Sequence, residues 1–148
     1  MSLVSLAQTG WSPAFAYEKI PLSAFFMGCI LLPLLMIVTN QYTIRNERFE
    51  NNVVWKRSDY WLLQFPFEIH FSWICAAFIL NLNIVGVDLG ASADTQMIIA
   101  AISLLILALG AWTCLRLHRP QFTFAWVVAW ATVSCRKALR YLIDLNEL

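Results

Sequence analysis

One stretch of this chain concentrates the side chains that could hold a ligand or transfer a proton. Between residues 64 and 83, an otherwise apolar sequence contains Gln64, Pro66, Glu68, His70, Ser72, Trp73, Asn81 and Asn83. In a helix each residue turns the chain by about 100°. One helical stripe then comprises His70, Ile74, Ala77 and Asn81, with Trp73 at its edge. Neutral imidazole is a good ligand for a metal or for the magnesium of a chlorin, and an indole ring stacks on flat rings. We therefore expect His70, Trp73 and Asn81 to line an interhelical pocket for a flat apolar ligand.

Each of these residues also has a structural interpretation that needs no ligand. His70 can hydrogen-bond to a neighbouring helix or lie among lipid headgroups, and Asn81 can tie two helices together by a hydrogen bond worth about 0.6–2 kcal/mol. Glu68 is two residues before His70, about 200° away around the helix, so the two form no acid–base pair on one face. Its carboxylate is a further candidate ligand contact. It also suits the first turn of a helix that starts near Pro66, where a negative charge interacts favourably with the helix dipole.

A second candidate site is the short turn RLHRP at residues 116–120. Arg116, His118 and Arg119 would contact anionic lipid headgroups there, or form an ordinary solvated turn. The four cysteines lie far apart, without a CxxC spacing or a histidine at zinc-finger distance, so we expect no metal site; they are Cys29, Cys75, Cys114 and Cys135. The sequence has no GxSxG, HExxH or phosphate-binding loop, and we expect no catalytic residue and no enzyme activity.

The composition assigns these residues to a membrane protein. Apolar and aromatic residues make up 60% of the 148 residues, and only 13% are charged, against about 25% in soluble domains. Every Asp, Glu, Lys and Arg lies outside residues 20–44, 69–87, 95–115 and 120–135. Because a bilayer core needs about 20 apolar residues of helix, the sequence predicts an all-α polytopic membrane protein with a bundle of about four transmembrane helices. A net charge of +1 excludes a basic domain that binds nucleic acid.

The expected layout is one membrane domain over residues 1–148. The spans are expected at about 21–43, 64–87, 95–115 and 120–136. They would be preceded by an interfacial arm at 1–19, in which Pro13 and Pro21 limit helix formation, and followed by an amphipathic tail at 137–148. Pro33 should kink the first span, and residues 45–59 should form one long polar loop.

Loop lengths and loop charges predict how the spans are arranged. The short connections at 88–94 and 116–119 should make the second, third and fourth spans antiparallel neighbours. Six of the ten Lys and Arg residues lie in the 45–59 and 116–119 loops. That side is therefore the expected cytoplasmic or stromal side.

The stretch that begins at Pro66 resembles a known family. Its sequence PFEIHFSWICAAFILNLN is similar to the signature helix of the tryptophan-rich sensory proteins related to TspO, the peripheral-type benzodiazepine receptor group, in which a pattern close to PFSIxxGWxxxATxxN recurs. The matching positions are Pro66, Phe67, Ile69, Trp73, Ala77 and Asn81, followed by Trp130 and Ala131 in AWVVAWATVS. The resemblance covers roughly residues 60–137. The departures are Glu68, Ser72, Phe78 and Ser134, which stand where the pattern has Ser, Gly, Thr and Gly.

The resemblance implies an all-helical membrane fold that is associated with porphyrins, other tetrapyrroles and sterol-like ligands. The TspO fold has five spans, one more than expected here, and its early ligand-binding helix has no match in residues 1–45. A chlorophyll or another tetrapyrrole, together with lipids, is the implied cofactor. Versions that read PFEIHFGW are typical of algal members, which indicates a plastid thylakoid membrane, with a mitochondrial or bacterial inner membrane as the alternative.

Two functions follow as hypotheses. The first is a non-catalytic accessory subunit that packs against a larger photosynthetic or respiratory membrane complex, its partners being other membrane-protein subunits, and contacts pigment, tetrapyrrole or lipid. The aromatic content of 14% and the few polar groups favour it. The alternative is a free-standing TspO-like sensor or transporter that binds a tetrapyrrole or lipid, in which Pro33 and the Glu68/His70 end of the second span control access.

Overall fold

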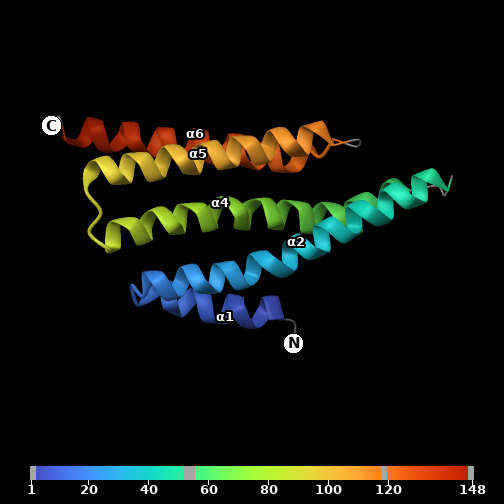
Figure 1. Cartoon of the computed structure of the whole chain (residues 1–148), viewed down its shortest axis with the longest axis horizontal. Helices are drawn as coiled ribbons and strands as arrows, with labels where there is room; N and C mark the ends of the chain where they lie inside the picture. Colours follow the sequence, from blue (N-terminus) through green and yellow to red (C-terminus); the bar gives the residue numbers. More distant parts are fainter. Residues whose placement is uncertain (1–2, 52–55, 118–119, 147–148) are drawn as a thin grey trace.

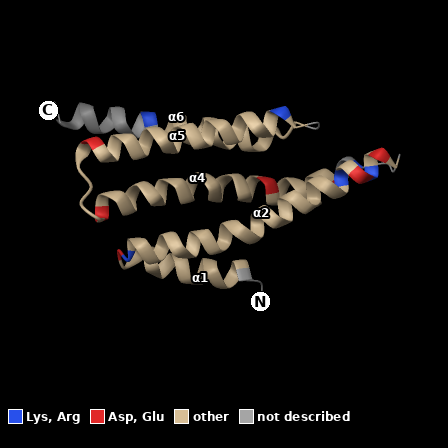
Figure 2. Ribbon diagram, in the orientation of Figure 1, with Lys and Arg blue, Asp and Glu red and all other residues tan. Residues whose placement is uncertain are grey.

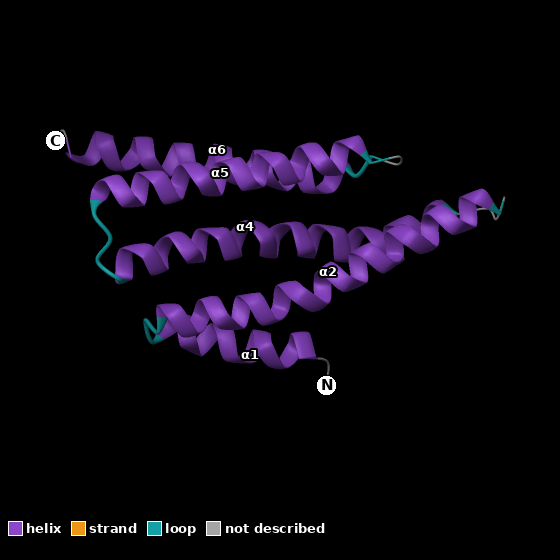
Figure 3. Ribbon diagram, viewed as in Figure 1, coloured by secondary structure: helices purple, strands orange, loops and turns teal. Residues whose placement is uncertain are grey.

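All regular structure in the described part of the chain is helical, as the all-α prediction requires (Figure 3). The structure is a computed structural model that describes residues 3–51, 56–117 and 120–146. Its elements are α1 (Leu3–Ala16), α2 (Ile20–Glu50), α3 (Arg57–Asp59), the π-helical turn η1 (Tyr60–Gln64), α4 (Phe65–Asp88), α5 (Ala93–Arg116) and α6 (Phe122–Asn146). The long helices lie alongside one another, and neighbours in sequence run in opposite directions (Figure 1).

The helices are long and apolar enough for a membrane. Three stretches qualify as spans, namely Ile20–Glu50, Tyr60–Asp88 and Ala93–Arg116, and Phe122–Ser134 is a shorter apolar helical segment. Charged residues gather near the helix ends, with one acidic position inside the α4 rod (Figure 2). The prediction of a polytopic helical membrane protein is confirmed, with three long spans and one shorter apolar helix.

Three segments are more helical than the sequence predicts. Residues 3–16 form α1 although Pro13 lies within it, because the proline is in the last turn and interrupts little of the helix. The helix ends where Glu18 adopts a left-handed φ of 56°. Residues 45–50, expected to begin the polar loop, are the last turns of α2, since Arg and Glu are good helix formers that stay solvated at a helix end. The expected tail is, as far as Asn146, a continuation of α6.

The two prolines of the long spans have different effects. α2 changes direction along its length (Figure 1), as Pro33 predicts. Pro66 lies in the first turn of α4, as expected, but α4 continues a helical rod that starts at Arg57. The π-helical turn η1 precedes it, and the N–H of Phe65 bonds to the carbonyl of Tyr60. A proline removes one donor from the helical ladder, and a π turn also departs from the usual hydrogen-bond pattern, so both irregularities lie at the junction of η1 and α4.

α4 is the central helix of the structure. It packs against α2, α5 and α6, whereas α1 packs on α2 and α5 packs on α6. Figure 1 shows α4 between α2 on one side and the α5–α6 pair on the other. α2 and α5 are not packed side by side in the described part of the chain. Their separation leaves one face of α4 uncovered by helix.

Polar side chains of α4 bond to three different neighbours. The amide of Asn81 donates to the Ser23 hydroxyl of α2 at 2.7 Å, and the amide of Asn83 donates to the Ser103 hydroxyl of α5 at 2.8 Å. The Thr123 hydroxyl of α6 donates to Glu68 at 2.9 Å. Lipid tails offer no hydrogen bonds, so a polar group on a membrane helix gains most from a partner on another helix.

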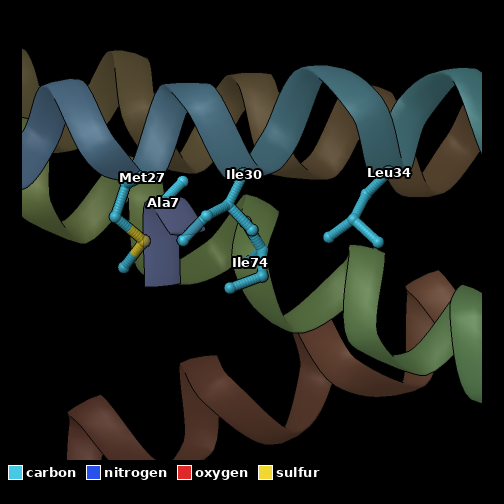
Figure 4. Close-up of a cluster of buried hydrophobic side chains, with 5 residues drawn as sticks. All are labelled: Ala7, Met27, Ile30, Leu34 and Ile74. Carbon is cyan, nitrogen blue, oxygen red and sulfur yellow. The ribbon is translucent and has the colours of Figure 1, made fainter. Parts of the chain in front are cut away.

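Apolar packing is concentrated at the α1–α2–α4 contact. Its buried cluster comprises Ala7, Met27, Ile30, Leu34 and Ile74 (Figure 4). α1 lies close to α2 at Gly10, where a β-carbon would come within 2.8 Å of the Phe26 ring. In α5, by contrast, Leu107 is the one buried residue. The outer surface of α5 is therefore left to lipid or to another protein.

The Asn81–Ser23 bond should be measurable by a double-mutant cycle. We expect Asn81→Ala and Ser23→Ala to couple by about 0.6 kcal/mol in the free energy of unfolding, the average for hydrogen bonds between membrane helices. Reversible unfolding in detergent micelles gives the four values. As a control, Asn81→Ala and Ser103→Ala should be additive within about 0.3 kcal/mol, because those residues are not bonded. Equal coupling in both cycles would contradict the assigned pairing.

Candidate ligand-binding groove

The uncovered face of α4 forms the floor of a groove. A cavity of about 820 Å³ lies between α2, α4, α5 and the start of α6. Its floor is made by residues of α4 that share one stripe, namely Phe71, Cys75, Phe78, Ile79 and Leu82. α2 and α5 form its walls. Because these two helices do not pack against each other, the groove is open along the side between them. Its volume is in the range of sites that hold drug-sized ligands.

The groove is apolar along most of its length and polar at one end. Its apolar lining comes from Leu31, Leu35, Phe78, Leu82, Ile106 and Leu107, and its polar lining from Thr39, Tyr42, Thr43, Thr113 and Gln121. No charged side chain is among the described residues that line it. Such a surface binds ligands by burial of apolar area and a few hydrogen bonds.

A buried carboxylate lies next to the groove. Glu68 is 4% exposed, and a very small cavity beside it shares Val38, Phe71, Cys114, Gln121 and Phe124 with the groove lining. The Gln64 amide donates to Oε1 of Glu68 at 2.6 Å, and the Thr123 hydroxyl donates to Oε2 at 2.9 Å. Both carboxylate oxygens thus have a donor, as a buried carboxylate requires.

Local sequence brings these donors to Glu68. Gln64 is four residues before Glu68, at the end of the π turn, so its side chain lies on the same face of the rod. Thr123 lies in the first turn of α6, and just before this helix the Gln121 N–H donates to the Cys114 carbonyl of α5 at 3.0 Å. Glu68 is therefore a contact between helices rather than an interfacial charge in a free first turn.

His70, Trp73 and Asn81, which the sequence predicts to line an interhelical pocket, are not among the residues that line the groove, whereas Glu68 lies beside it. Cys75 of the groove floor is five residues after His70, hence about 140° around α4. His70 is half-buried, and its Nε2 atom has no hydrogen-bond partner among the described residues. Trp73 packs on Trp130 of α6 with ring centroids 5.4 Å apart. Asn81 bonds to α2, so its structural interpretation is the one that the geometry supports.

Of the three residues predicted to contact lipid headgroups, the structure describes Arg116. The Arg116 guanidinium lies 4.4 Å from the centroid of the Trp112 ring at the end of α5. His118 and Arg119 lie outside the described residues. The contact of Arg116 with an exposed indole is typical of a side chain at the membrane interface.

Sequence reasoning did not single out the groove floor. Its positions 71, 75, 78 and 82 follow the same helical periodicity as the stripe with His70, but they carry apolar residues and no chemical signal. In the described part of the chain no three His, Cys, Asp or Glu residues are placed to hold a metal ion. The arrangement supports noncovalent binding of an apolar molecule.

Comparison with known protein families gives a match over most of the chain. The sequence model of a family described as TSPO-like protein matches residues 1–136. None of the curated proteins and none of the solved structures matches this chain. The family match includes α1 and α2, whereas the resemblance noted in the sequence covers roughly residues 60–137.

Removing the Thr123 hydroxyl should destabilise the protein, because one oxygen of the buried Glu68 carboxylate loses its hydrogen-bond donor. We expect Thr123→Val to lower the free energy of unfolding by about 1–3 kcal/mol, because Oε2 of Glu68 loses its donor while remaining buried. Thr132→Val is the matched control, since Thr132 is exposed on the same helix and bonds to its own backbone. Its effect should stay within about 0.5 kcal/mol. Equal effects in thermal unfolding of the two variants would refute the role of Thr123.

Proposed function

The chain belongs to the TSPO-like protein family, and from this premise we propose that it is a non-catalytic membrane protein that binds a lipid or tetrapyrrole in the groove between α2, α4 and α5. The observation that carries the proposal is the groove itself, with its volume of about 820 Å³ and a lining in which none of the described residues is charged. A free-standing binding protein, sensor or transporter accounts for this groove better than a purely structural subunit does.

The route into the groove supports a ligand that comes from the membrane. The opening of the groove lies between α2 and α5 and runs along both helices. Because these helices are apolar enough to span the bilayer, the opening faces the hydrocarbon. An apolar ligand can enter there from the hydrocarbon without crossing water. Transfer from lipid gains little hydrophobic free energy, so binding relies on close packing and on hydrogen bonds at the polar end.

The side chains around the groove favour binding over catalysis. Both oxygens of Glu68 accept hydrogen bonds from side chains of the protein. His70, the other acid–base candidate, lies on a different face of α4. A general base must reach the proton that it removes. Neither Glu68 nor His70 lines the groove, and because they lie on different faces of α4 they cannot act together on a bound ligand.

A tryptophan in the groove wall should block the ligand. Leu35 lines the groove on α2, whereas Leu32, one turn earlier and 65% exposed, does not. We expect Leu35→Trp to fill the cavity and to reduce the ligand that copurifies in mild detergent at least tenfold, measured by native mass spectrometry. Leu32→Trp adds the same ring outside the groove and should retain the ligand. Equal retention by both variants would contradict the groove as the binding site.

A second candidate places a tetrapyrrole beside His70. Its Nε2 atom is buried without a partner among the described residues, and a neutral imidazole nitrogen of this kind fits a metal ligand. The imidazole would hold the central metal of a haem or chlorophyll and thereby supply the axial ligation that these pigments take from proteins. Such a site would lie outside the groove.

Exposed tryptophans on α5 and α6 support the accessory-subunit hypothesis as another candidate function. Trp112, Trp126 and Trp130 are each more than half exposed, and a larger membrane complex could cover them. In this form of the proposal the protein is a subunit of a photosynthetic or respiratory complex, with the thylakoid as its membrane.

Size fractionation in mild detergent with an absorption spectrum of each fraction separates these possibilities. For the proposed function we expect a small particle that contains this chain and its ligand. A Soret band in that particle that disappears in His70→Ala but persists in Leu35→Trp would place a tetrapyrrole at His70 instead. Migration of the chain with a large pigmented complex would make it an accessory subunit.

A further inference from the structure

The ends of the groove differ in a way that selects among ligands. We propose that the groove binds an uncharged, single-tailed amphiphile whose head donates a hydrogen bond, with the head beside Tyr42 and Gln121 and the tail along Leu31 and Leu82. The inference rests on the proposed function, because it concerns the same groove, and it narrows the ligand to a neutral lipid with a hydroxyl-type head.

Polarity changes along the groove in one direction. On α2 the lining runs from Leu31 to Thr43, thirteen residues that extend about 18 Å in a helix. α5 runs in the same direction, and the lining on this side goes from Ile106 to Thr113 and ends at Leu117. On the antiparallel α4, Leu82 lies at the apolar end. A ligand that follows this lining is elongated, with one polar end.

The polar end is the end near the membrane surface. The last two turns of α2 directly beyond Thr43 carry four charged residues, and α5 ends at Arg116. The Arg45 guanidinium lies 5.4 Å from the centroid of the Tyr42 ring. A lipid in the bilayer holds its head at the surface and its tail in the hydrocarbon. The groove therefore matches the orientation that a lipid already has.

The hydroxyl groups at the polar end are arranged as acceptors. Thr39, Thr43 and Thr113 each donate their own proton to a backbone carbonyl of the same helix, at 2.8 to 3.1 Å. Their oxygen atoms keep a lone pair for an incoming donor. A head with an O–H group complements three acceptors of this kind.

Charge disfavours an ionised head. No charged side chain is among the described residues that line the groove, and the Arg45 guanidinium packs on the Tyr42 ring without being one of them, so a buried anionic head would lose its hydration without a cation among these lining residues. The carboxylate of Glu68 lies in the adjoining cavity, which shares Gln121 and Cys114 with the groove, and it would repel an anion. A neutral head avoids both costs.

The test uses two probes that differ in the head alone. The probes are hexadecanol and hexadecyl sulfate, each with a diazirine near the end of the tail. Each is incubated with the full-length chain in liposomes and irradiated. The labelled peptides are then mapped by mass spectrometry. We expect hexadecanol to label residues at the Leu31 and Leu82 end at least ten times more strongly than hexadecyl sulfate does. Labelling at the Tyr42 end would overturn the orientation.

Variants of the polar end test the head. We expect Tyr42→Phe combined with Gln121→Leu to reduce hexadecanol labelling about tenfold, the effect of one or two lost hydrogen bonds. Tyr17→Phe combined with Gln8→Leu, both exposed on or near α1, should leave it unchanged. Thr43→Lys places a cation at the polar end and should raise labelling by hexadecyl sulfate. If the polar-end and control pairs behave alike, Tyr42 and Gln121 do not hold the head and the inference fails.

The outcomes separate this inference from the proposed function. Groove labelling by hexadecyl sulfate that equals or exceeds labelling by hexadecanol, and is abolished by Leu35→Trp, would refute the neutral head and leave the groove as a ligand site. If neither probe labels the groove and the native ligand is retained by Leu35→Trp, both proposals fail together.

Discussion

The structure depends on one constraint: polar side chains on a helix within hydrocarbon need partners on other helices. α4 meets it by bonding through Asn81 to α2, through Asn83 to α5 and through Glu68 to α6. Asn81 and Asn83 are two residues apart, hence about 200° around α4. α2 and α5 are therefore held on separate faces of the central helix, and the space between them is the groove.

The buried carboxylate shows how a local defect becomes part of the packing. Pro66 interrupts the helical ladder, the π turn before it absorbs the interruption, and Gln64 is left one turn from Glu68. The carboxylate is thus held by the amide of Gln64 and the hydroxyl of Thr123 without a cation among the donors. This cluster adjoins the polar end of the groove, because its small cavity and the groove share Gln121 and Cys114.

Buried side chains are distributed unevenly among the helices. α1, α2 and α4 share the buried cluster around Ile30 and Ile74, whereas α5 buries Leu107 alone. A helix with so little buried surface is held by few contacts, and such elements move more readily than well-packed ones. Of the two groove walls, α5 is therefore the one with less buried surface.

Composition and charge placement by themselves determined the all-α membrane fold, because an apolar helix of about 20 residues has few alternatives to crossing a bilayer. The motif from Pro66 to Asn81 likewise indicated the family. The groove could not be predicted in this way. The stripe with His70 and the stripe with Phe71 have the same helical period, and only the spacing of α2 and α5 around α4 decides which of them faces open space. That spacing is set by hydrogen bonds between residues far apart in the chain, such as Asn81 with Ser23, and so it is a property of the tertiary structure.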